Sequence, residues 1–233
     1  FLKQQDEFTD YDFEGSGMNI LLDVLAYNTH YLGFNANMLA NEMFLDSAAL
    51  RSSVVSHAKT LGYEVSSPRA PIATVNISLS TTASTKTMPA GTAFTTTVDG
   101  TSYQFVTVSD ITSNSTGSSI PFDSVNIYEG SYVTTKYTVD TSDVDQRFLL
   151  SDARSDTTTL KVKVQNSASD STTTTYTKAT DITQLYASST VYFIQETDSG
   201  LFEIYFGDGK VSTALSDGNI VILQYVVTNK TAS

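Results

Sequence analysis

The stretch LGYEVSSPRAPIATVNISLS, residues 61–80, decides the fold class of this chain. Gly62 is typical of the position just after a helix, and Pro68 and Pro71 prevent a helix from continuing through this stretch. From residue 72 onward, apolar and polar residues alternate with the two-residue period of a β-strand. The sequence therefore predicts helices before this boundary and strands after it.

Upstream of the boundary, the spacing of apolar residues predicts a long helix that begins near Met18, with Ser16 as its N-cap. Apolar side chains recur every three or four residues in two neighbouring stripes, one made of Ile20, Val24, Tyr27, Tyr31, Phe34 and Met38, the other of Leu21, Leu25, Leu32 and Leu39. Such a wide apolar face serves a domain core on one side and a partner on the other.

A second, shorter helix is predicted to follow, with Asp46 or Ser47 as its N-cap and Gly62 just beyond its end. In the first helix, Gly33 and several asparagines lower the intrinsic helix propensity. Packing against other elements must therefore stabilise that helix.

Downstream, the alternation predicts strands at residues 72–79, 93–97, 102–108, 125–128, 132–139, 160–164, 191–196, 201–206 and 220–228. Asp99-Gly100 is a hairpin signal between two of them. The Ser/Thr-rich runs at residues 113–119, 155–159 and 167–175 are predicted to be exposed turns or loops, although Thr also suits edge strands. A short helix is possible at residues 181–186. The predicted fold class is α+β: an N-terminal helical segment followed by a mainly antiparallel β region.

The predicted domain organisation has three parts. Residues 1–66 form a helical arm, residues 67–111 and 200–233 form a β body, and residues 112–199 form an intervening β subdomain. In this prediction, the strands near residues 88–94 and 202–229 share one sheet.

Composition excludes several classes of protein. The formal net charge of −12 opposes binding to nucleic acid or to an anionic membrane. The absence of cysteine removes disulfides, thiolate catalysis and cysteine-ligated zinc. No apolar run approaches the roughly 20 residues of a membrane-spanning helix. The first residue is Phe, and we expect the sequence to be a fragment of a longer chain.

Catalytic motifs are weak. His57, Ser53 and Asp46 supply the residue types of a Ser-His-Asp catalytic triad. The chain, however, has no G-x-S-x-G turn around a nucleophile, so the sequence does not support such a triad. His57 and His30 are better interpreted as residues of a helix surface or interface. Residues 207–210, Gly-Asp-Gly-Lys, lack the spacing of a phosphate-binding loop and predict a tight turn.

Two acidic clusters are also better explained without a ligand. Residues 140–146, DTSDVDQ, offer carboxylates that could bind Ca²⁺, but they lack the glycine and glutamate of an EF-hand loop. A solvated acidic turn is the better interpretation of Asp140, Asp143 and Asp145. The N-terminal cluster is interpreted as a solvated face and, as a hypothesis only, as an electrostatic docking strip; it comprises Asp6, Glu7, Asp10, Asp12 and Glu14.

One segment also resembles a known family. Residues 9–63, TDYDFEGSGMNILLDVLAYNTHYLGFNANMLANEMFLDSAALRSSVVSHAKTLGY, are similar to the start of the T4-like phage baseplate wedge proteins known as gene product six, which are related to the baseplate J-like proteins. MPAGTAF at residues 88–94 and FEIYFGDGKVSTALSDGNIVILQYVVTN at residues 202–229 support the resemblance. Lys230 departs from it, because the family often has Gly after Thr-Asn.

The resemblance implies a non-enzymatic structural subunit of a contractile tail baseplate, located in the virion and assembled in the host cytoplasm. It implies that copies pair as dimers within an inner ring around the tail hub, that the ring relays the change that triggers sheath contraction, and that no cofactor, nucleic acid or membrane insertion is involved. The implied partners are other wedge subunits, including a lysozyme-like one and a long wedge protein. The expected partner interface is Tyr27, Tyr31, Phe34 and Met38, with Asn28 and Asn35 fixing the register.

Two alternatives remain open. A β region rich in Ser, Thr and Tyr also suits a glycan-binding tail or adhesin module, which would display exposed aromatic platforms. A wall-degrading hydrolase would need converging carboxylates in a cleft, and no sequence feature identifies such a pair.

Overall fold

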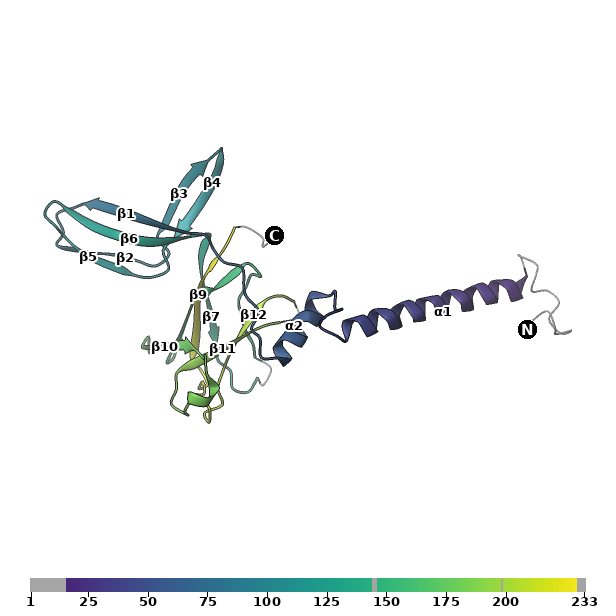
Figure 1. The fold of residues 1–233 in the computed structure, drawn as a ribbon. Helices are drawn as coiled ribbons and strands as arrows, with labels where there is room; N and C mark the ends of the chain where they lie inside the picture. Colours follow the sequence, from purple (N-terminus) through teal and green to yellow (C-terminus); the bar gives the residue numbers. More distant parts are fainter. Residues whose placement is uncertain (1–15, 144–145, 198, 230–233) are drawn as a thin grey trace. The chain divides into compact units, whose positions relative to one another are not determined.

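The computed structural model describes residues 16–143, 146–197 and 199–229 of the 233-residue chain (Figure 1). The chain divides into two compact units, Phe1–Glu64 and Val65–Ser233, called here the helical unit and the β unit. The described part of the helical unit carries two α-helices, and the β unit carries mainly antiparallel strands. The predicted α+β fold class is confirmed.

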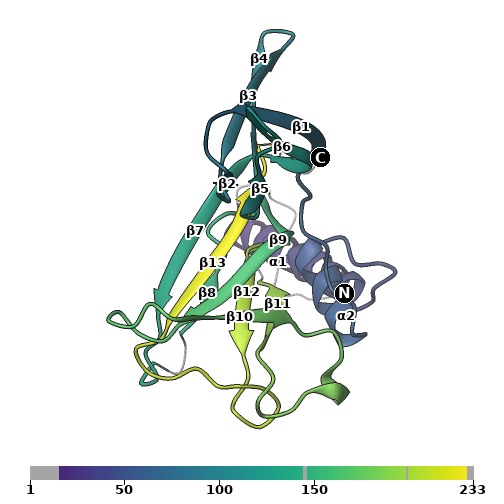
Figure 2. The same ribbon diagram turned by 90° about the vertical axis from the view of Figure 1, so that its left-hand side faces the viewer.

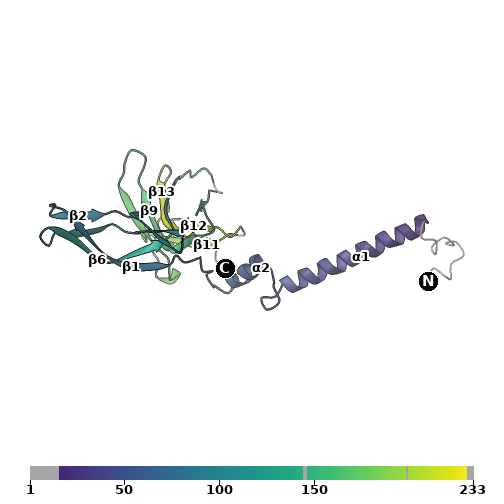
Figure 3. The ribbon, with the colours of Figure 1, turned by 90° about the horizontal axis from the view of Figure 1, so that it is seen from above.

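Helix α1 (Gly17–Glu42) is one continuous helix (Figures 1 and 3). The Ser16 hydroxyl oxygen accepts a hydrogen bond of 3.1 Å from the backbone N–H of Asn19, so the predicted N-cap is confirmed. Helix α2 (Arg51–Thr60) ends in a Schellman motif. The N–H of Gly62 donates to the carbonyl of Lys59, and the N–H of Tyr63 donates to that of Ala58, each at 2.9 Å. Gly62 has a φ of 78°, as predicted for the residue that ends this helix.

The first part of the β unit contains a four-stranded sheet in the order β1-β6-β4-β3 and a two-stranded sheet of β2 and β5. Their bounds are β1 (Ile72–Ser80), β2 (Thr85–Met88), β3 (Ala93–Val98), β4 (Thr101–Val106), β5 (Ile111–Asn114) and β6 (Ser119–Glu129). The predicted hairpin joins β3 to β4, with positive φ at both Asp99 (49°) and Gly100 (79°). Buried side chains of β6, among them Ile120 and Phe122, form the core of this part.

The second part is a seven-stranded sheet in the order β7-β13-β9-β10-β11-β12-β8 (Figure 2). Its strands are β7 (Ser131–Thr138), β8 (Phe148–Leu149), β9 (Ser155–Gln165), β10 (Thr173–Lys178), β11 (Val191–Glu196), β12 (Phe202–Phe206) and β13 (Ile220–Val227). Only the pair β10–β11 is parallel among the described strands. A single 3₁₀ turn, η2 (Ile182–Gln184), lies where a short helix was expected.

The large sheet buries the main core of the β unit on one face. Alternate residues of the central strand β13, Val221, Leu223 and Tyr225, are fully buried there. Side chains of the neighbouring strands, such as Val162 and Ile204, complete the core. Ile222 and Val226, on the other side of β13, are also buried, so this central strand is covered on both faces along most of its length.

The predicted shared sheet is wrong. β3 and β4 belong to the four-stranded sheet, whereas β12 and β13 belong to the seven-stranded one. The chain passes from the four-stranded sheet to the seven-stranded sheet at Gly130, between β6 and β7. Within each sheet, some neighbouring strands are distant in sequence. The division into folding units at residues 111 and 199 stays a prediction.

The prediction of a loop at residues 155–159 is also wrong, because this run begins strand β9. Ser155 and Asp156 are buried despite their polarity. The Thr159 hydroxyl accepts a 2.9 Å hydrogen bond from the N–H of Val226 and donates to the carbonyl of Asp156 at 2.8 Å. The register with β13 shifts between Gln224 and Val226, so this hydroxyl satisfies a backbone donor at an irregularity in the sheet.

The two parts of the β unit are joined by buried contacts. Ala70, Val106 and Val226 form a small apolar cluster between them. The buried carboxylate of Asp156 accepts a 2.8 Å hydrogen bond from the N–H of Ala70. The Asn229 side-chain amide donates to the Glu129 carboxylate at 3.2 Å. These bonds pair polar groups across the junction, whereas the buried Tyr132 hydroxyl, beside the same apolar cluster, has no hydrogen-bond partner among the described residues.

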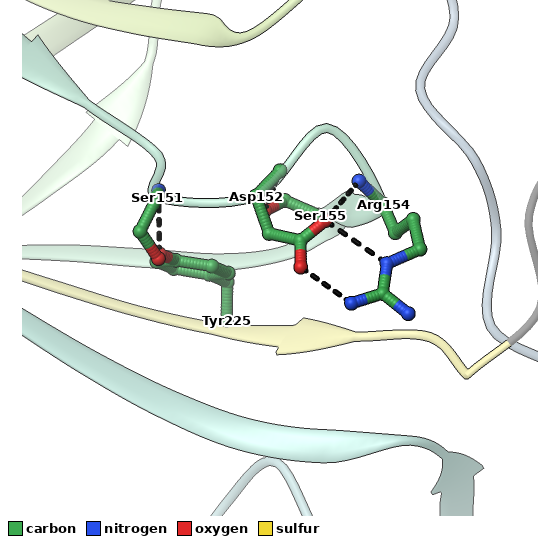
Figure 4. A network of polar contacts seen from close by, with 5 residues as sticks. All are labelled: Ser151, Asp152, Arg154, Ser155 and Tyr225. Carbon is green, nitrogen blue, oxygen red and sulfur yellow. Dashed lines mark hydrogen bonds and ion pairs between the residues drawn. The ribbon is translucent and has the colours of Figure 1, made fainter.

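The turn between β8 and β9 is held by polar contacts (Figure 4). The Arg154 guanidinium donates to both carboxylate oxygens of Asp152, at 3.0 and 2.6 Å, and this hydrogen bonding lowers the pKa of Asp152. The phenol oxygen of Tyr225, from β13, lies 2.8 Å from the hydroxyl oxygen of Ser151 and accepts from the Ser151 N–H at 3.0 Å. The turn is thereby fixed to the central strand.

Candidate partner-binding surface

Helix α1 displays its apolar side chains to solvent. All of α1 is described, and none of its residues is buried. The exposed fractions are 62% for Tyr27, 51% for Tyr31, 61% for Phe34 and 44% for Met38. The second stripe is equally exposed, with Leu32 at 69% and Leu39 at 70%. A continuous exposed apolar surface is typical of an interaction site, so this side of α1 is the candidate surface.

The four predicted interface residues, Tyr27, Tyr31, Phe34 and Met38, lie on one face of α1. Their spacing of four, three and four residues keeps them within about one sixth of the helix circumference, at about 100° per residue. The rings of Tyr27 and Tyr31 are in contact, with centroids 5.0 Å apart and planes tilted by 47°. This contact gives the face a preformed aromatic ridge.

Asn28 and Asn35 lie between the two apolar stripes. At about 100° per residue, both asparagines fall on the line that separates the Tyr27 stripe from the Leu32 stripe. A partner helix that covers both stripes would meet these amides near the middle of the contact. The structure thus assembles the predicted residues into one surface, which we call the α1 face: the two stripes with Asn28 and Asn35.

A corner links α1 to α2 at one end of the α1 face. The Glu42 carboxylate accepts hydrogen bonds from the backbone N–H groups of Ala49, at 3.0 Å, and Leu50, at 3.3 Å. A hydrogen bond from the Ser53 hydroxyl and the backbone bond from Ala49 lower the pKa of Glu42. His57 Nε2 lies 2.9 Å from the backbone oxygen of Glu42. Residues from both helices thus stabilise the corner.

The corner corrects the predicted start of α2. The N-cap position is Leu50, which cannot cap with its side chain, so the prediction of Asp46 or Ser47 is wrong. Instead, the Ser47 hydroxyl donates to the carbonyl of Asn41 at 2.7 Å, and Glu42 supplies the acceptor for the backbone N–H groups of Ala49 and Leu50, just before the first turn of α2. No local motif marks Glu42 for this role, because it lies seven residues before Ala49 and the chain must fold back to bring them together.

A hollow of about 290 Å³ opens beside the corner. Phe34 and Met38 of the α1 face line it together with Ala49 and Leu50. Its lining is mainly apolar, and the Glu42 carboxylate stands at its polar side. The α1 face therefore ends in a concave site that an apolar side chain of a partner can enter.

Residues considered for catalysis or metal binding have structural explanations. His57 bonds to the backbone of α1, as described above. The Asp140 carboxylate accepts hydrogen bonds from the N–H and hydroxyl of Ser142, at 2.9 and 2.6 Å, and these bonds lower its pKa. Within the described ranges, no group of three or more His, Asp or Glu side chains could hold a metal ion. Asp145 and the N-terminal acidic cluster, Asp6, Glu7, Asp10, Asp12 and Glu14, lie outside the described residues.

Residues 207–210 form the predicted turn. Gly209 has a φ of 84°, and the Asp208 carboxylate accepts a 3.0 Å hydrogen bond from the N–H of Lys210. This bond contributes to a lowered pKa of Asp208. Gly207 is required by close approach, since a Cβ there would overlap the Ser212 hydroxyl. Backbone geometry explains both glycines without a bound phosphate.

The glycan-binding alternative predicted exposed aromatic platforms. Phe193 and Tyr205 stack at 5.3 Å with 18° between their planes, and Tyr205 is 42% exposed. The two residues are direct cross-strand partners on β11 and β12. Cross-strand aromatic pairs of this kind are a usual means of stabilising a sheet, so the pair has a structural explanation.

In the described part of the chain, no helix is both long and apolar enough to cross a membrane.

Comparison with known proteins finds similarity to one family in two regions of the chain, the helical unit and the seven-stranded sheet. Residues 1–63 match the helical domain of the baseplate wedge protein gp6-like family, and residues 133–231 match the third domain of the bacteriophage baseplate wedge protein gp6. Between them lie residues 64–132, which contain β1 to β6. The chain is also 31% identical to baseplate wedge protein gp6 of Enterobacteria phage T4, over 98% of its own length. It spans 36% of the length of that relative.

Proposed function

Because this chain belongs to the family of T4-like phage baseplate wedge proteins, we propose that it is part of a structural subunit of a contractile tail baseplate. The subunit lies in the inner ring around the tail hub. There it joins neighbouring subunits and relays the change of shape that triggers sheath contraction. The role is structural rather than enzymatic.

The exposure of α1 is the observation that carries this proposal. An isolated helix is marginally stable in water, and burial of its apolar face supplies most of the stability it needs. In α1 no residue is buried and Tyr27, Phe34 and Leu32 are each more than half exposed. The helix therefore requires a partner of matching apolar surface, as a subunit in an assembly would have.

We propose that a second copy of the chain is the first partner, so that two α1 faces pack as a dimer within the ring. Asn28 and Asn35 then pair across the contact and fix its register, since a buried amide is satisfied in only one alignment. Other wedge subunits, including a lysozyme-like one and a long wedge protein, join this pair of helices and complete an inter-subunit helical bundle. The hollow beside Glu42 receives an apolar side chain from one of them.

The test replaces two central residues of the α1 face, Tyr31→Ala with Phe34→Ala. The full-length subunit is mixed with the other baseplate proteins, and the mass of the complexes is measured by light scattering after size exclusion. We expect the dimer and the mixed complexes to dissociate at least tenfold more readily than those of the unchanged subunit, since each lost aromatic anchor costs about 1–2 kcal/mol or more.

The matched control is Thr29→Ala with His30→Ala, on the opposite side of α1. It truncates two exposed polar side chains of the same helix and leaves the α1 face intact. Helix content from circular dichroism must remain equal in both double variants. Undiminished assembly of the Tyr31 and Phe34 variant, with the fold intact, would overturn the proposed role of α1.

The relay is tested separately in assembled phage. A variant of the α1 face that still enters the baseplate is expected to contract its sheath more slowly or at the wrong time, which electron microscopy of triggered particles would show. Normal contraction of particles that carry the variant would remove the relay from the proposal and leave the structural role.

A further inference from the structure

A row of lysines crosses the outer face of the seven-stranded sheet. The register pairs Lys136 of β7 with Ile222 of β13, and Ile222 with Lys163 of β9. The two lysines therefore flank β13 about 10 Å apart, two strand spacings. Lys161 lies two residues from Lys163 and so projects from the same face of β9.

This face is opposite to the core. Val221, Leu223 and Tyr225 point into the core, so Ile222 and Gln224 project from the other side of β13. Ile222 is only 9% exposed although it lies on the outer face. The aliphatic stems of Lys136 and Lys163, on either side of it, explain this shelter and leave their ammonium groups toward solvent.

The charge of this face contrasts with that of the chain. The formal net charge is −12, with only 13 Lys and Arg in the sequence. Three of these cations lie together on one face. In the described part of the chain, neither Lys136 nor Lys163 is ion-paired with a carboxylate. Their positive potential is thus left for a partner.

Lys161 is fixed in place by the loop after β4. Its ammonium donates to the Ser109 hydroxyl at 2.6 Å and to the carbonyl of Val108 at 2.5 Å. Partial burial and the neighbouring Lys163 lower its pKa. These contacts hold the Lys161 side chain at one end of the face.

A hollow adjoins the lysines where two strands diverge. β10 leaves β9 after the pair Tyr176–Val162 and continues beside β11 (Figure 2). The gap has a volume of about 450 Å³. The residues that line it include Leu160, Tyr176 and Tyr192 and the lysines Lys161, Lys163 and Lys178. A hollow lined by both apolar side chains and lysines suits a segment that carries an apolar side chain and carboxylates.

We propose that the lysine face, defined by Lys136, Lys161, Lys163 and the adjoining hollow, binds an acidic polypeptide segment of another baseplate subunit. Carboxylates of the segment meet Lys136 and Lys163, and an apolar side chain enters the hollow. The inference rests on the proposed function, because it places the partner in the same assembly. Nucleic acid is the less suitable polyanion, since the net charge of −12 repels its extended backbone.

The experiment compares two charge-matched double variants of the full-length subunit. Lys136→Glu with Lys163→Glu reverses the lysine face, whereas Lys86→Glu with Lys210→Glu makes the same change of charge at exposed residues elsewhere in the β unit. Each is assembled with the other baseplate proteins of the same phage, and the assemblies are treated with a carbodiimide that joins amines to carboxylates in direct contact. Mass spectrometry identifies the joined residues, and thermal unfolding checks the fold of both variants.

We expect Lys136 or Lys163 of the unchanged subunit to be joined to an Asp or Glu of another subunit. The face variant should lose these links and bind that subunit about five- to tenfold more weakly, while the control variant binds as the unchanged subunit does. Equal weakening by both variants, or links only within the same subunit, would overturn the inference. If the face variant lost binding to a short single-stranded DNA but still bound the other subunit normally, the face would be assigned to nucleic acid instead.

The outcomes also separate this inference from the proposed function. An unchanged subunit that assembles normally without links at Lys136 or Lys163 overturns the lysine face alone. An unchanged subunit that joins none of the baseplate proteins overturns the proposed function and the present inference together.

Discussion

The Glu42 carboxylate, at the last residue of α1, accepts a hydrogen bond of 3.0 Å from the backbone N–H of Ala49. It thereby satisfies a backbone donor just before α2, in the place where a side-chain N-cap is missing. One side chain of the first helix thus specifies how the second helix begins. The corner that results shapes the hollow at the end of the α1 face.

Replacement of Glu42 by Ala should loosen this corner. The amides of Ala49 and Leu50 lose their acceptor, so hydrogen exchange at these two positions should accelerate, while exchange in the middle of α1 stays unchanged. The matched control is Glu64→Ala, which removes a glutamate from the same unit but beyond the end of α2. Equal protection of Ala49 in the Glu42 variant and in the unchanged chain would show that the carboxylate does not hold the corner.

The corner should also weaken in acid. Hydrogen bonding to the carboxylate lowers the Glu42 pKa below its usual value of 4.5. A carboxyl group whose pKa is depressed by folding contributes stability that is fully present above the unfolded-state pKa and is lost as the pH falls through the folded-state pKa. Exchange protection of the Ala49 amide, followed by NMR as the pH is lowered below 4.5, should therefore decline in step with protonation of Glu42. Glu42→Gln should abolish that dependence.

The Tyr225 hydroxyl should contribute measurably to the stability of the β unit. Tyr225 is fully buried, and its phenol oxygen bonds to Ser151 (Figure 4). It also lies 3.3 Å from the Thr135 hydroxyl. Tyr225→Phe removes these bonds with almost no change of volume, so we expect a loss of about 0.5–1.5 kcal/mol in the free energy of unfolding. Urea denaturation measures it, and Tyr186→Phe, at a site that is 73% exposed, is the control that should change little. If Tyr225→Phe lowered the free energy of unfolding no more than the control variant does, the stabilising role of the Tyr225 hydroxyl would be disproved.

Gly130, where the chain passes from one sheet to the other, should tolerate no side chain. Its φ is 133°, and a Cβ there would lie 2.2 Å from the carbonyl oxygen of Val227, a backbone atom that cannot rotate away. Gly117 has a similar φ of 125° with nothing within 4 Å of an added Cβ. Gly117→Ala should thus cost only backbone strain, about 1–3 kcal/mol, and Gly130→Ala substantially more. Equal unfolding free energies for the two variants would contradict the close approach.

The pKa of Asp170 tests whether hydrogen bonds within an exposed loop are formed in solution. Hydrogen bonds from Asn166 and from Thr172 lower its pKa to about 2. The Asn166 side chain donates to its carboxylate at 2.8 Å, so Asn166→Ala should return the pKa toward the ordinary value of 3.8. NMR titration of the Asp170 carboxyl carbon would measure the change, and a pKa unaffected by the substitution would disprove the role of Asn166.

Local sequence patterns predicted the elements that depend on nearby residues. Ser16 caps α1, Gly62 ends α2, and Asp99-Gly100 turns the β3–β4 hairpin, since each of these roles is completed within a few residues. The α1 face was likewise readable, because helical spacing alone places Tyr27, Tyr31 and Phe34 together.

Other features were missed because distant segments decide them. The run at residues 155–159 looked like a loop from its composition, but β13 supplies the neighbours that bury Ser155 and use the Thr159 hydroxyl. The shared sheet was mispredicted because strand pairing depends on long-range contacts that no single segment encodes. Glu42 and the lysine face escaped notice for the same reason.

The sequence by itself determined that helices precede a largely antiparallel β region, that the first helix carries two apolar stripes, and that the net charge is strongly negative, because periodicity and charge are properties of the residues alone. Only the tertiary structure decided that Lys136 and Lys163 stand on either side of Ile222. These three residues lie on separate strands, and pairing through β13, whose register is set by burial of its alternate side chains in the core, brings them into one row.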